Sequence, residues 1–390
     1  MTDPDRLAEL ATETLERLIA FDTTSRRTNL ELIEFAEQRL AACGARMRRV
    51  GNADGSKANL IALIGPQSDG GVLLSGHTDV VPVDGQPWTS DPWVLTRREG
   101  RFYGRGTADM KAFLALALAA APDFAAAPLK RPVQLAFSYD EEIGCLGAPS
   151  LIADLVRTGP RPSVVVVGEP TRMETVSGHK GIATFKVTVT GKEAHSSLTH
   201  LGVSAIMEAA RLIACISELA RELERGADPG SPFTPKGASL TIGQIHGGTA
   251  VNILARECVF AFDLRAPPGV DAKAVLRPVF QMAAKLDAEL KARAPEAGVK
   301  LETRSSTPPL RPDPDGEAET LARRLAGDNG PARVVSYAAE AGQFQEAGYS
   351  TVICGPGSIE QAHQPDEYLE VSQLERGAAF MARLVEHLAQ

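Results

Sequence analysis

Hydrophobic positions in the first 178 residues follow two different periods. Near the N-terminus apolar residues recur every three to four positions, which predicts amphipathic helices over 6–20 and 29–42. Short, almost continuously apolar runs then alternate with further helical stretches, and such runs are typical of strands covered on both faces of a sheet. The predicted strands are 60–64, 72–75, 133–138 and 163–167, and the predicted helices between them are 110–121, ended by Pro122, and 148–157. This order predicts an α/β domain with a mostly parallel sheet.

The pattern changes near residue 178. Apolar and polar residues alternate over 183–190, as in a strand with one exposed face. After it we expect a helix over 203–223, a polar loop at 226–237, strands over 239–246 and 258–265, and a helix over 271–292. Strand–helix–strand–strand–helix predicts a smaller, ferredoxin-like α+β domain. The first pattern then returns, with helices over 317–325 and 371–388, so we expect one domain formed by 1–178 and 297–390 and a second domain inserted at 179–296.

Composition narrows the possible roles. A chain of 390 residues with 44% hydrophobic and 23% charged residues is long enough for two packed domains. The net charge of −8 and the absence of basic clusters argue against nucleic acid as a partner. No apolar run reaches the ~18 residues of a membrane span, and the acidic start is unlike a signal peptide. Five scattered cysteines without a Cys-x-x-Cys pair indicate neither a disulfide framework nor a zinc–thiolate site, so we expect a cytoplasmic protein.

Side chains that can bind metal ions follow the predicted strands or lie in turns. The segments are 73–79 with His77 and Asp79, 103–111 with Asp109, 137–142 with Asp140, Glu141 and Glu142, 167–170 with Glu169, and 361–363 with His363. The first four are spaced about 30 residues apart, close to one βα unit each, and parallel strands bring such positions to one sheet edge. Each residue alone has an ordinary explanation, such as a helix N-cap for Asp109. Together they predict a metal site.

The donor types indicate which chemistry this site performs. Two imidazoles and several carboxylates suit zinc, cobalt or manganese better than calcium. A carboxylate can bridge two ions ~3.5–4 Å apart, and such a pair activates water and polarises a carbonyl group. A further carboxylate must then carry the proton. Neighbouring residues of an extended segment point to opposite sides, so one of Glu141 and Glu142 can bind metal while the other faces substrate. The residues alone do not say which.

Over nearly the whole chain these segments resemble the M20 metallopeptidase family of dinuclear amidohydrolases. The matching segments are 75–82, 104–111, 138–144, 168–171, 191–197, 247–252 and 355–367. The resemblance implies two divalent ions per subunit, Zn²⁺ or Co²⁺. It implies that the ligands are His77, Asp109 and Glu169 for one ion and Asp109, Glu142 and His363 for the other. It also implies a bridging role for Asp109 and a cis peptide after this residue.

The resemblance also implies catalytic roles. Glu141 would be the general base, taking a proton from the attacking water and passing it to the leaving amine. Asp79 would orient His77 through its second ring nitrogen. The smaller domain would serve as a lid and as the dimerisation domain of a homodimer. His195 of this domain would steady the oxyanion, often in the site of the partner subunit.

Further residues would bind the substrate. By the same resemblance Asn252 donates to an oxyanion or carboxylate, and Arg265 offers a bidentate fork to the substrate carboxylate. The glycine-rich loop with Gly355, Gly357 and Ser358 either presents backbone N–H groups to that carboxylate or is only a tight turn, and the residues leave both readings open.

Within the family, the segments 140–148, 338–344 and 355–363 are most similar to acetylornithine deacetylases. This implies a small N-acyl amino acid as substrate, N2-acetylornithine converted to ornithine and acetate in arginine biosynthesis. A cationic side chain favours an acidic partner, and Glu340 is a candidate, with a carboxylate at a helix start as the alternative. A succinyl-diaminopimelate desuccinylase, a broad aminoacylase or a carboxypeptidase remains an alternative. A serine hydrolase would need a Gly-x-Ser-x-Gly elbow, and the sequence has none. A catalytically dead relative would lack one of the expected ligands or the base, and all of them are present.

Overall fold

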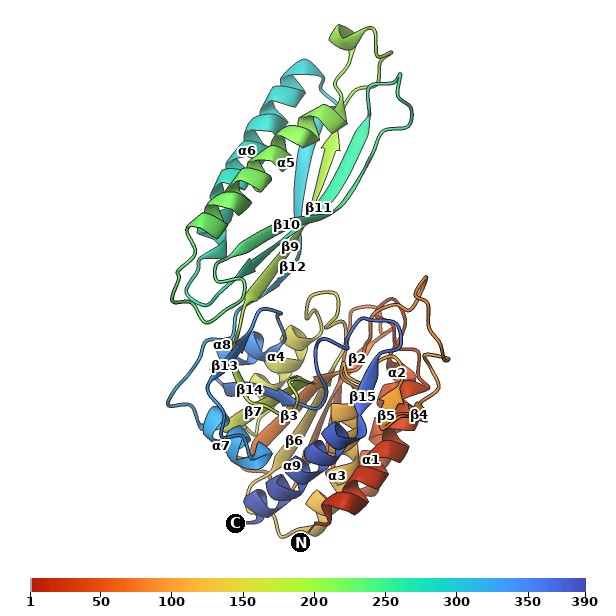
Figure 1. Ribbon diagram of the computed structural model, residues 1–390, viewed down its shortest axis with the longest axis vertical. Coiled ribbons are helices and arrows are strands. Elements are labelled where there is room, and N and C mark those ends of the chain that lie inside the picture. The colour runs from red at the N-terminus through yellow and green to blue at the C-terminus, as the bar shows by residue number, and fades with distance from the viewer. Residues whose placement is uncertain (1) are drawn as a thin grey trace. The chain divides into compact units, whose positions relative to one another are not determined.

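The computed structural model describes residues 2–390, which divide into two compact units (Figure 1). The first unit comprises the chain up to Gly178 with Leu310–Val334 and Ala339–Gln390, and the second comprises His179–Pro309 and Val335–Ala338. The expected end of the insertion at residue 296 therefore lies too early, because a further strand follows it within the second unit.

The first unit is built around a large sheet. Its strands are β1 (Arg46–Gly51), β2 (Ala58–Ile64), β3 (Val72–His77), β6 (Val133–Ser138), β7 (Val164–Pro170), β8 (Val176–His179), β13 (Arg333–Val335) and β14 (Ser350–Gly355), with β4 (Thr96–Arg98), β5 (Arg101–Tyr103) and β15 (Tyr368–Glu370) in a small separate sheet. Its helices are α1 (Pro4–Ile19), α2 (Leu30–Ala42), α3 (Lys111–Ala126), α4 (Ala148–Thr158), α7 (Glu317–Ala326), α8 (Ala341–Glu346) and α9 (Val371–Ala389). Among the described helices of the chain, none combines the length and the apolar character of a membrane span.

The centre of the large sheet is parallel, as the apolar runs predict. The strand order is β1-β2-β6-β3-β7-β14-β8-β13, and β6, β3, β7 and β14 run parallel to their neighbours within this group. Antiparallel pairs flank them on both sides. Helix α3 packs on one face beneath α1 and α9, while α4 and α8 cover the opposite face (Figure 1). The parallel strands therefore end together at one edge of a sheet that is covered on both faces.

Helix α3 is buried along almost its entire length, which explains why it is apolar on all sides. The prediction that Pro122 ends this helix is wrong, because α3 continues to Ala126. A proline at this position removes one N–H donor from the helix ladder, the one that would bind the carbonyl of Leu118. The surrounding core holds the remaining turn in place.

The second unit has one four-stranded antiparallel sheet and two long helices. The elements are β9 (Gly181–Thr190), the 3₁₀ turn Thr199–Leu201, α5 (Ala205–Arg225), β10 (Ser239–Gly247), β11 (Glu257–Ala266), α6 (Ala272–Arg293) and β12 (Gly298–Thr307). The strand order is β10-β11-β9-β12. Burial alternates along β9 and β11, whose inward residues pack against α5 and α6. The alternation predicted for 183–190 thus matches a sheet with one covered face.

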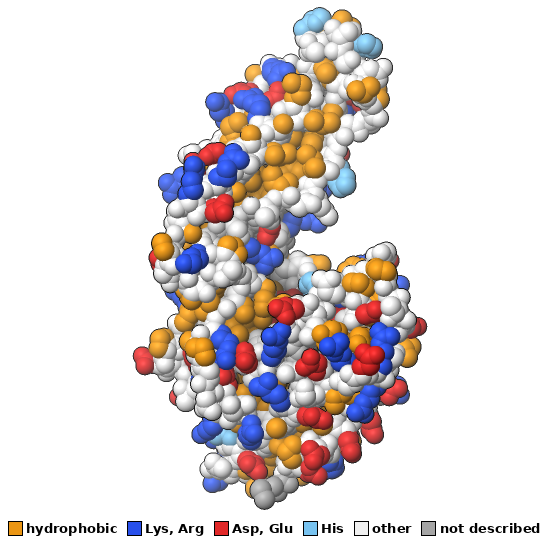
Figure 2. Space-filling view, in the orientation of Figure 1, with side chains coloured by type: hydrophobic (Ala, Val, Ile, Leu, Met, Phe, Trp, Pro, Cys, Tyr) orange, Lys and Arg blue, Asp and Glu red, His pale blue; other side chains and the backbone are white. Residues whose placement is uncertain are grey.

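Apolar side chains are also exposed on the second unit, as Figure 2 shows on the face in view. Met207 on α5 is 70% exposed, and Ile245 on β10 is 53% exposed. Strand β10 is at an edge of its sheet. An exposed edge strand with apolar neighbours is typical of a surface that pairs with another chain.

Candidate metal centre

The ends of β3, β6 and β7 bring several acidic groups and an imidazole together. His77 is the last residue of β3, and Glu169 lies near the end of β7. A glycine precedes each of them, because the start of α3 packs against both strands. A Cβ on Gly76 would lie 2.6 Å from Met110 Cε, and one on Gly168 would lie 2.0 Å from a ring carbon of Phe113. This close packing brings the residue before Met110, Asp109, to the edge of the sheet.

Asp109 stands between two imidazoles. Its Oδ1 lies 2.9 Å from Nε2 of His77, and its Oδ2 lies 3.3 Å from Nε2 of His363. The side chain of His77 is 1% exposed and that of Asp109 is 6% exposed, whereas that of His363 is half exposed. The Asp109–Met110 peptide is cis, as the family resemblance implies. Each carboxylate oxygen therefore faces a different imidazole, which is the arrangement that a bridging ligand needs.

Two further carboxylates complete the cluster. Glu142 Oε2 lies 3.0 Å from Nε2 of His363, and Glu169 Oε1 lies 3.8 Å from Nε2 of His77. The buried atoms Glu142 Oε1 and Glu169 Oε1 have no hydrogen-bond partner among residues 2–390. Buried acceptor atoms normally have partners, so these two oxygens point to a cation that they would bind. Imidazole and carboxylate donors together fit divalent zinc or cobalt.

The pKa values of the clustered groups show that the buried carboxylates need positive charge beside them. Burial, reinforced by Asp109, raises the pKa of Glu142 to about 7 and that of Glu169 well above its usual value. Burial opposes ionisation of Asp109 as well, but hydrogen bonds with His363 and His77 hold its pKa below the usual range. Hydrogen bonds with Asp109 and Glu142 raise the pKa of His363 to about 11. Protons thus balance the charge of the carboxylates, a role that metal ions would take over.

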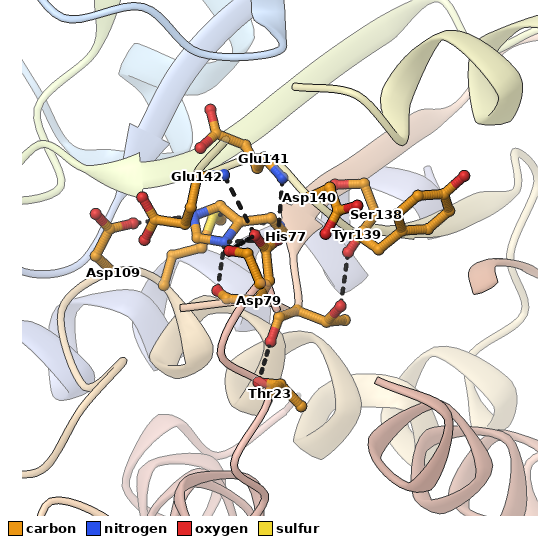
Figure 3. A network of polar contacts seen from close by, with 12 residues as sticks. Thr23, His77, Asp79, Asp109, Ser138, Tyr139, Asp140, Glu141 and Glu142 are labelled. Atoms are coloured by element: carbon orange, nitrogen blue, oxygen red, sulfur yellow. Dashed lines mark hydrogen bonds and ion pairs between the residues drawn. The ribbon is translucent and has the colours of Figure 1, made fainter. Parts of the chain in front are cut away.

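Glu141 and Glu142 leave their loop in different directions (Figure 3). The carboxylate of Glu142 lies beside that of Asp109, while Glu141 accepts a hydrogen bond from the thiol of Cys145, with Sγ 3.1 Å from Oε1. Burial raises the pKa of Glu141 to about 8. Glu142 therefore contacts the imidazole of His363, while a carboxylate oxygen of Glu141 lies within 4.8 Å of possible ligand atoms of His77 and Glu169.

The structure corrects the way in which Asp79 supports the site. Nδ1 of His77 lies 2.8 Å from the backbone carbonyl of Asp79, but 3.7 Å from its carboxylate. The carboxylate accepts the backbone N–H groups of Glu141 and Glu142 at 3.0 and 3.3 Å, and the hydroxyl of Ser25 at 2.7 Å (Figure 3). The carbonyl of Asp79 therefore orients His77, and its carboxylate positions the loop that carries both glutamates.

Glu340 does not have the environment of a residue that binds a substrate's cationic group. It is 1% exposed, and its two oxygens accept hydrogen bonds from the hydroxyls of Ser75 at 2.5 Å and Ser138 at 2.8 Å. Both oxygens are engaged beneath the strand ends, and Glu340 directly precedes α8, so its surroundings favour the alternative of a carboxylate at a helix start. Glu340 links β3 to β6, because Ser75 belongs to β3, two residues before His77, and Ser138 is the last residue of β6.

The loop after β14 is a tight turn with its N–H groups already bound. The backbone N–H of Gly355 donates to Thr171 Oγ1, that of Gly357 to Gln373 Oε1 and that of Ser358 to Gln361 Oε1. A Cβ on Gly355 would lie 1.9 Å from the carbonyl oxygen of Gly168, so glycine is required for close packing on β7. Of the two readings that the residues leave open, the structure favours the turn over a carboxylate site.

The second unit separates its three predicted residues into two groups. His195 and Asn252 lie on neighbouring segments joined by a bridge between His195 and Ile253, and both side chains are exposed. The N–H of Ser197 donates to Nδ1 of His195, so the neutral ring carries its proton on Nε2, where it can donate to a ligand. Arg265 is at the other end of β11, roughly 25 Å along the strand, and it pairs with Asp263. The structure therefore does not bring Arg265 together with the other two.

Sequence reasoning missed two groups that hold the candidate ligands in place. The carbonyl of Asp79 is a backbone atom, which no residue pattern marks. Glu367 lies inside a segment that resembles the M20 family, but nothing in its sequence neighbourhood marks its contacts with the loop of Asp109.

Comparison with known proteins assigns the chain to a family. The model of Peptidase family M20/M25/M40 matches residues 73–387, which include all five candidate ligands. The chain belongs to the M20 peptidase family. It is 36% identical over 385 residues to acetylornithine deacetylase of Myxococcus xanthus, covering 96% of both chains. It is 35% identical over 332 residues to acetylornithine deacetylase of Proteus mirabilis, covering 85% of this chain and 82% of the relative.

Solved structures of M20 enzymes share the fold. An M20 family metallo-carboxypeptidase of Sulfolobus solfataricus superposes with a TM-score of 0.77 at 17% identity, over 97% of this chain and 99% of the other. A dinuclear metal binding peptidase of the M20 family from Bacillus subtilis gives 0.62 at 17% identity, over 98% of each chain. Membership in the M20 family makes this chain a hydrolase that works with a pair of divalent ions. Two groups of side chains bring possible ligand atoms within 4.8 Å of one another: His77, Asp109 and Glu142, and His77, Glu141 and Glu169, so the residue expected to be the base also borders the ion site.

Proposed function

We propose that this M20 enzyme hydrolyses the amide bond of an N-acyl amino acid, and that its substrate is N2-acetylornithine, which it converts to ornithine and acetate in arginine biosynthesis. The observation that carries the amidohydrolase assignment is the placement of Asp109, with one carboxylate oxygen toward each imidazole and two unpartnered glutamate oxygens nearby. Relatives named acetylornithine deacetylase, 36% and 35% identical over most of the chain, support the choice of substrate.

The residues of the first unit divide the chemistry among them. His77, Glu169 and Asp109 would hold one ion, and Asp109, Glu142 and His363 the other, with Zn²⁺ or Co²⁺ as the ions. Two such ions would activate water and polarise the acyl carbonyl. Glu141 would accept the proton of the attacking water and deliver it to the leaving amine. In the metal-free protein burial raises the pKa of Glu141 to about 8, and the positive charge of bound ions would lower it, so that the carboxylate can accept a proton.

The second unit would supply groups that contact the substrate. His195, with the proton on Nε2, and Asn252 would steady the developing oxyanion in the site of the partner subunit. Arg265, which lies far from both, would bind the substrate carboxylate at the other site of the dimer. We assign the second unit the role of lid and of dimerisation domain of a cytoplasmic homodimer. The exposed edge of β10 and the exposed side chains of Met207 and Ile245 support the dimer.

A substrate panel tests the proposal. Protein stripped with a chelator and refilled with Zn²⁺ or Co²⁺ is assayed for amine release from N2-acetylornithine, N-succinyl-diaminopimelate, other N-acetyl amino acids and dipeptides. We expect activity to vanish on stripping and return on refilling, with the highest kcat/KM for N2-acetylornithine. Full activity without metal would contradict the amidohydrolase assignment.

A different M20 substrate is the second candidate, and one observation favours keeping it. The acidic residue that sequence reasoning assigned to the ornithine side chain, Glu340, is buried and bound to two serines. The described site thus contains no assigned partner for a cationic side chain. A desuccinylase, a broad aminoacylase or a carboxypeptidase would give its highest kcat/KM in the same panel with the succinyl, other acetyl or dipeptide substrates.

A further inference from the structure

A buried ion pair joins the two loops that carry Asp109 and His363. Arg105 and Glu367 are each 1% exposed, and Arg105 Nη1 lies 2.7 Å from Glu367 Oε2. The guanidinium also lies over the ring of Trp88, 5.1 Å from its centre. Removing one partner of a fully buried ion pair leaves an uncompensated charge, so both residues depend on each other. The proposed chemistry uses neither of them.

Glu367 is the point around which the loop of Asp109 folds. Its Oε1 accepts the backbone N–H groups of Ala108 at 2.8 Å and Asp109 at 3.0 Å, and its Oε2 accepts that of Gly106 at 3.1 Å. Three N–H groups and one guanidinium thus converge on a single carboxylate. The backbone at Asp109 is held in place by a residue that lies four positions after His363 in the sequence.

The other arm of the network reaches His363 itself. Arg105 Nη2 donates to Gln86 Oε1, and Gln86 Nε2 donates to the carbonyl of His363 at 2.9 Å. His363 has a φ of 64°, a left-handed conformation that a residue with a Cβ adopts only when its surroundings hold it there. The carboxylate of Asp366, close by in the same loop, accepts the N–H of Thr89 at 2.9 Å. Arg105 therefore connects to the backbone of Asp109 through Glu367 and to the backbone of His363 through Gln86.

We infer that Arg105 and Glu367 are positioning residues that set the spacing between Asp109 and His363, and so determine how tightly the ion between Asp109, Glu142 and His363 is bound. The inference rests on the proposed two-metal function. The physical reason is preorganisation: ligands fixed before the ion arrives lose less conformational freedom on binding, and supporting groups of this kind typically change metal affinity about 10–100-fold.

Asp328 provides a matched control for the test. It is also a buried carboxylate of the first unit, with its side chain 5% exposed. It accepts the backbone N–H groups of Thr175 and Gly330, each at 2.9 Å, and pairs with Arg333 at 2.9 Å. It holds no candidate ligand. Glu367→Gln and Asp328→Asn therefore make the same chemical change in two carboxylates that each bind backbone N–H groups and an arginine, with and without a connection to the cluster.

The experiment measures the affinity of the full-length protein for Zn²⁺ alone, by competition with a chromogenic chelator, together with thermal unfolding of the metal-free form. We expect Glu367→Gln to weaken the binding of one of the two ions about tenfold or more, while Asp328→Asn leaves both affinities unchanged and lowers the unfolding midpoint to a comparable degree. Equal affinities in Glu367→Gln and the parent protein, or equal losses in the two variants, would overturn the inference.

A second variant keeps the test decisive if Glu367→Gln does not fold. Gln86 is partly exposed, and its two contacts link Arg105 to the carbonyl of His363 without touching the loop of Asp109. Gln86→Ala should therefore fold and still weaken the binding of one ion. An unchanged affinity in this variant would likewise count against the inference. These measurements use no substrate, so they stand even if the parent enzyme proves inactive on N2-acetylornithine, which would contradict the proposed function alone.

Discussion

The strand ends of the first unit and the His195 loop of the second unit carry catalytic candidates of very different kinds. His77, Asp109 and Glu169 are 5% exposed or less and lie in a cluster of opposing charges. His195 is exposed, and its ring contacts Ser197 two residues further along. The first region is preorganised to hold ions, whereas the second presents a single donor. Changes in the first region should alter metal binding, proton transfer and stability, and changes in the second should alter the rate alone.

The largest expected effect is that of Glu141→Gln. The substitution keeps the shape of the side chain but removes the group that carries the proton, so kcat should fall about 10³-fold while both ions stay bound. Activity on the preferred N-acyl substrate and metal content per chain are the measurements. Glu142→Gln is the matched control, because Glu142 contacts His363, and it should lower metal affinity instead. Equal metal content and equal activity in the two variants would refute this division of roles.

A smaller loss of rate is expected for His195→Ala. Removing one donor to an oxyanion typically lowers kcat about 10²-fold, and an exposed loop residue should leave metal content and the unfolding midpoint unchanged. His200→Ala is the control, since His200 is an exposed histidine of the same unit without an assigned role. If the two variants have the same kcat, His195 takes no part in the reaction. Recovery of activity on mixing His195→Ala with Glu141→Gln would show that the histidine serves the site of the partner subunit.

The smallest expected effect is a pH dependence of stability that belongs to the first region. In the metal-free protein the pKa values of Glu141, Glu142 and His363 are raised to about 8, 7 and 11. The folded form then holds protons that the unfolded form releases, so the free energy of unfolding falls as pH rises from about 5 through 8. We expect the unfolding midpoint of stripped protein to drop by several degrees across this range.

The metal-loaded protein is the control for this measurement. Ligands must lose their protons to bind an ion, so the stabilisation by metal should grow over the same pH range. A stripped protein whose midpoint rises from pH 5 to pH 8 would show that the carboxylates of the cluster are not protonated in the folded state.

The sequence predicted the parts of the fold in which burial follows a simple period. The runs at 60–64, 133–138 and 163–167 appear as β2, β6 and β7 because both faces of the central sheet are covered. Strand β12 was missed because it is an edge strand with mostly polar residues and no regular alternation of burial, and its partner β9 selects its conformation. Its absence from the prediction is the reason that the boundary at 296 lies too early.

For the candidate site, the sequence predicted which groups come together more successfully than how they are supported. The strand ends explain the convergence of His77, Glu142 and Glu169, because parallel strands end at one edge, whereas Asp109 comes from the turn before α3. The supporting contacts depend on backbone atoms and on partners far away in the sequence, such as the carbonyl of Asp79 and the serines that engage Glu340. Their geometry exists only after the chain has folded, so no local pattern indicates it.

Strand β12 also has a consequence for the history of the molecule. Because β12 pairs with β9, the chain leaves the inserted unit beside the point where it entered, with Thr307 opposite Ile182, about one strand spacing or 5 Å away. A short turn would reconnect the parent fold, and every candidate ligand would remain on it. An insertion whose ends lie side by side can be gained, lost or exchanged without changing the strand order of the sheet that carries it. The second unit could therefore change in evolution while the metal-binding first unit keeps its structure.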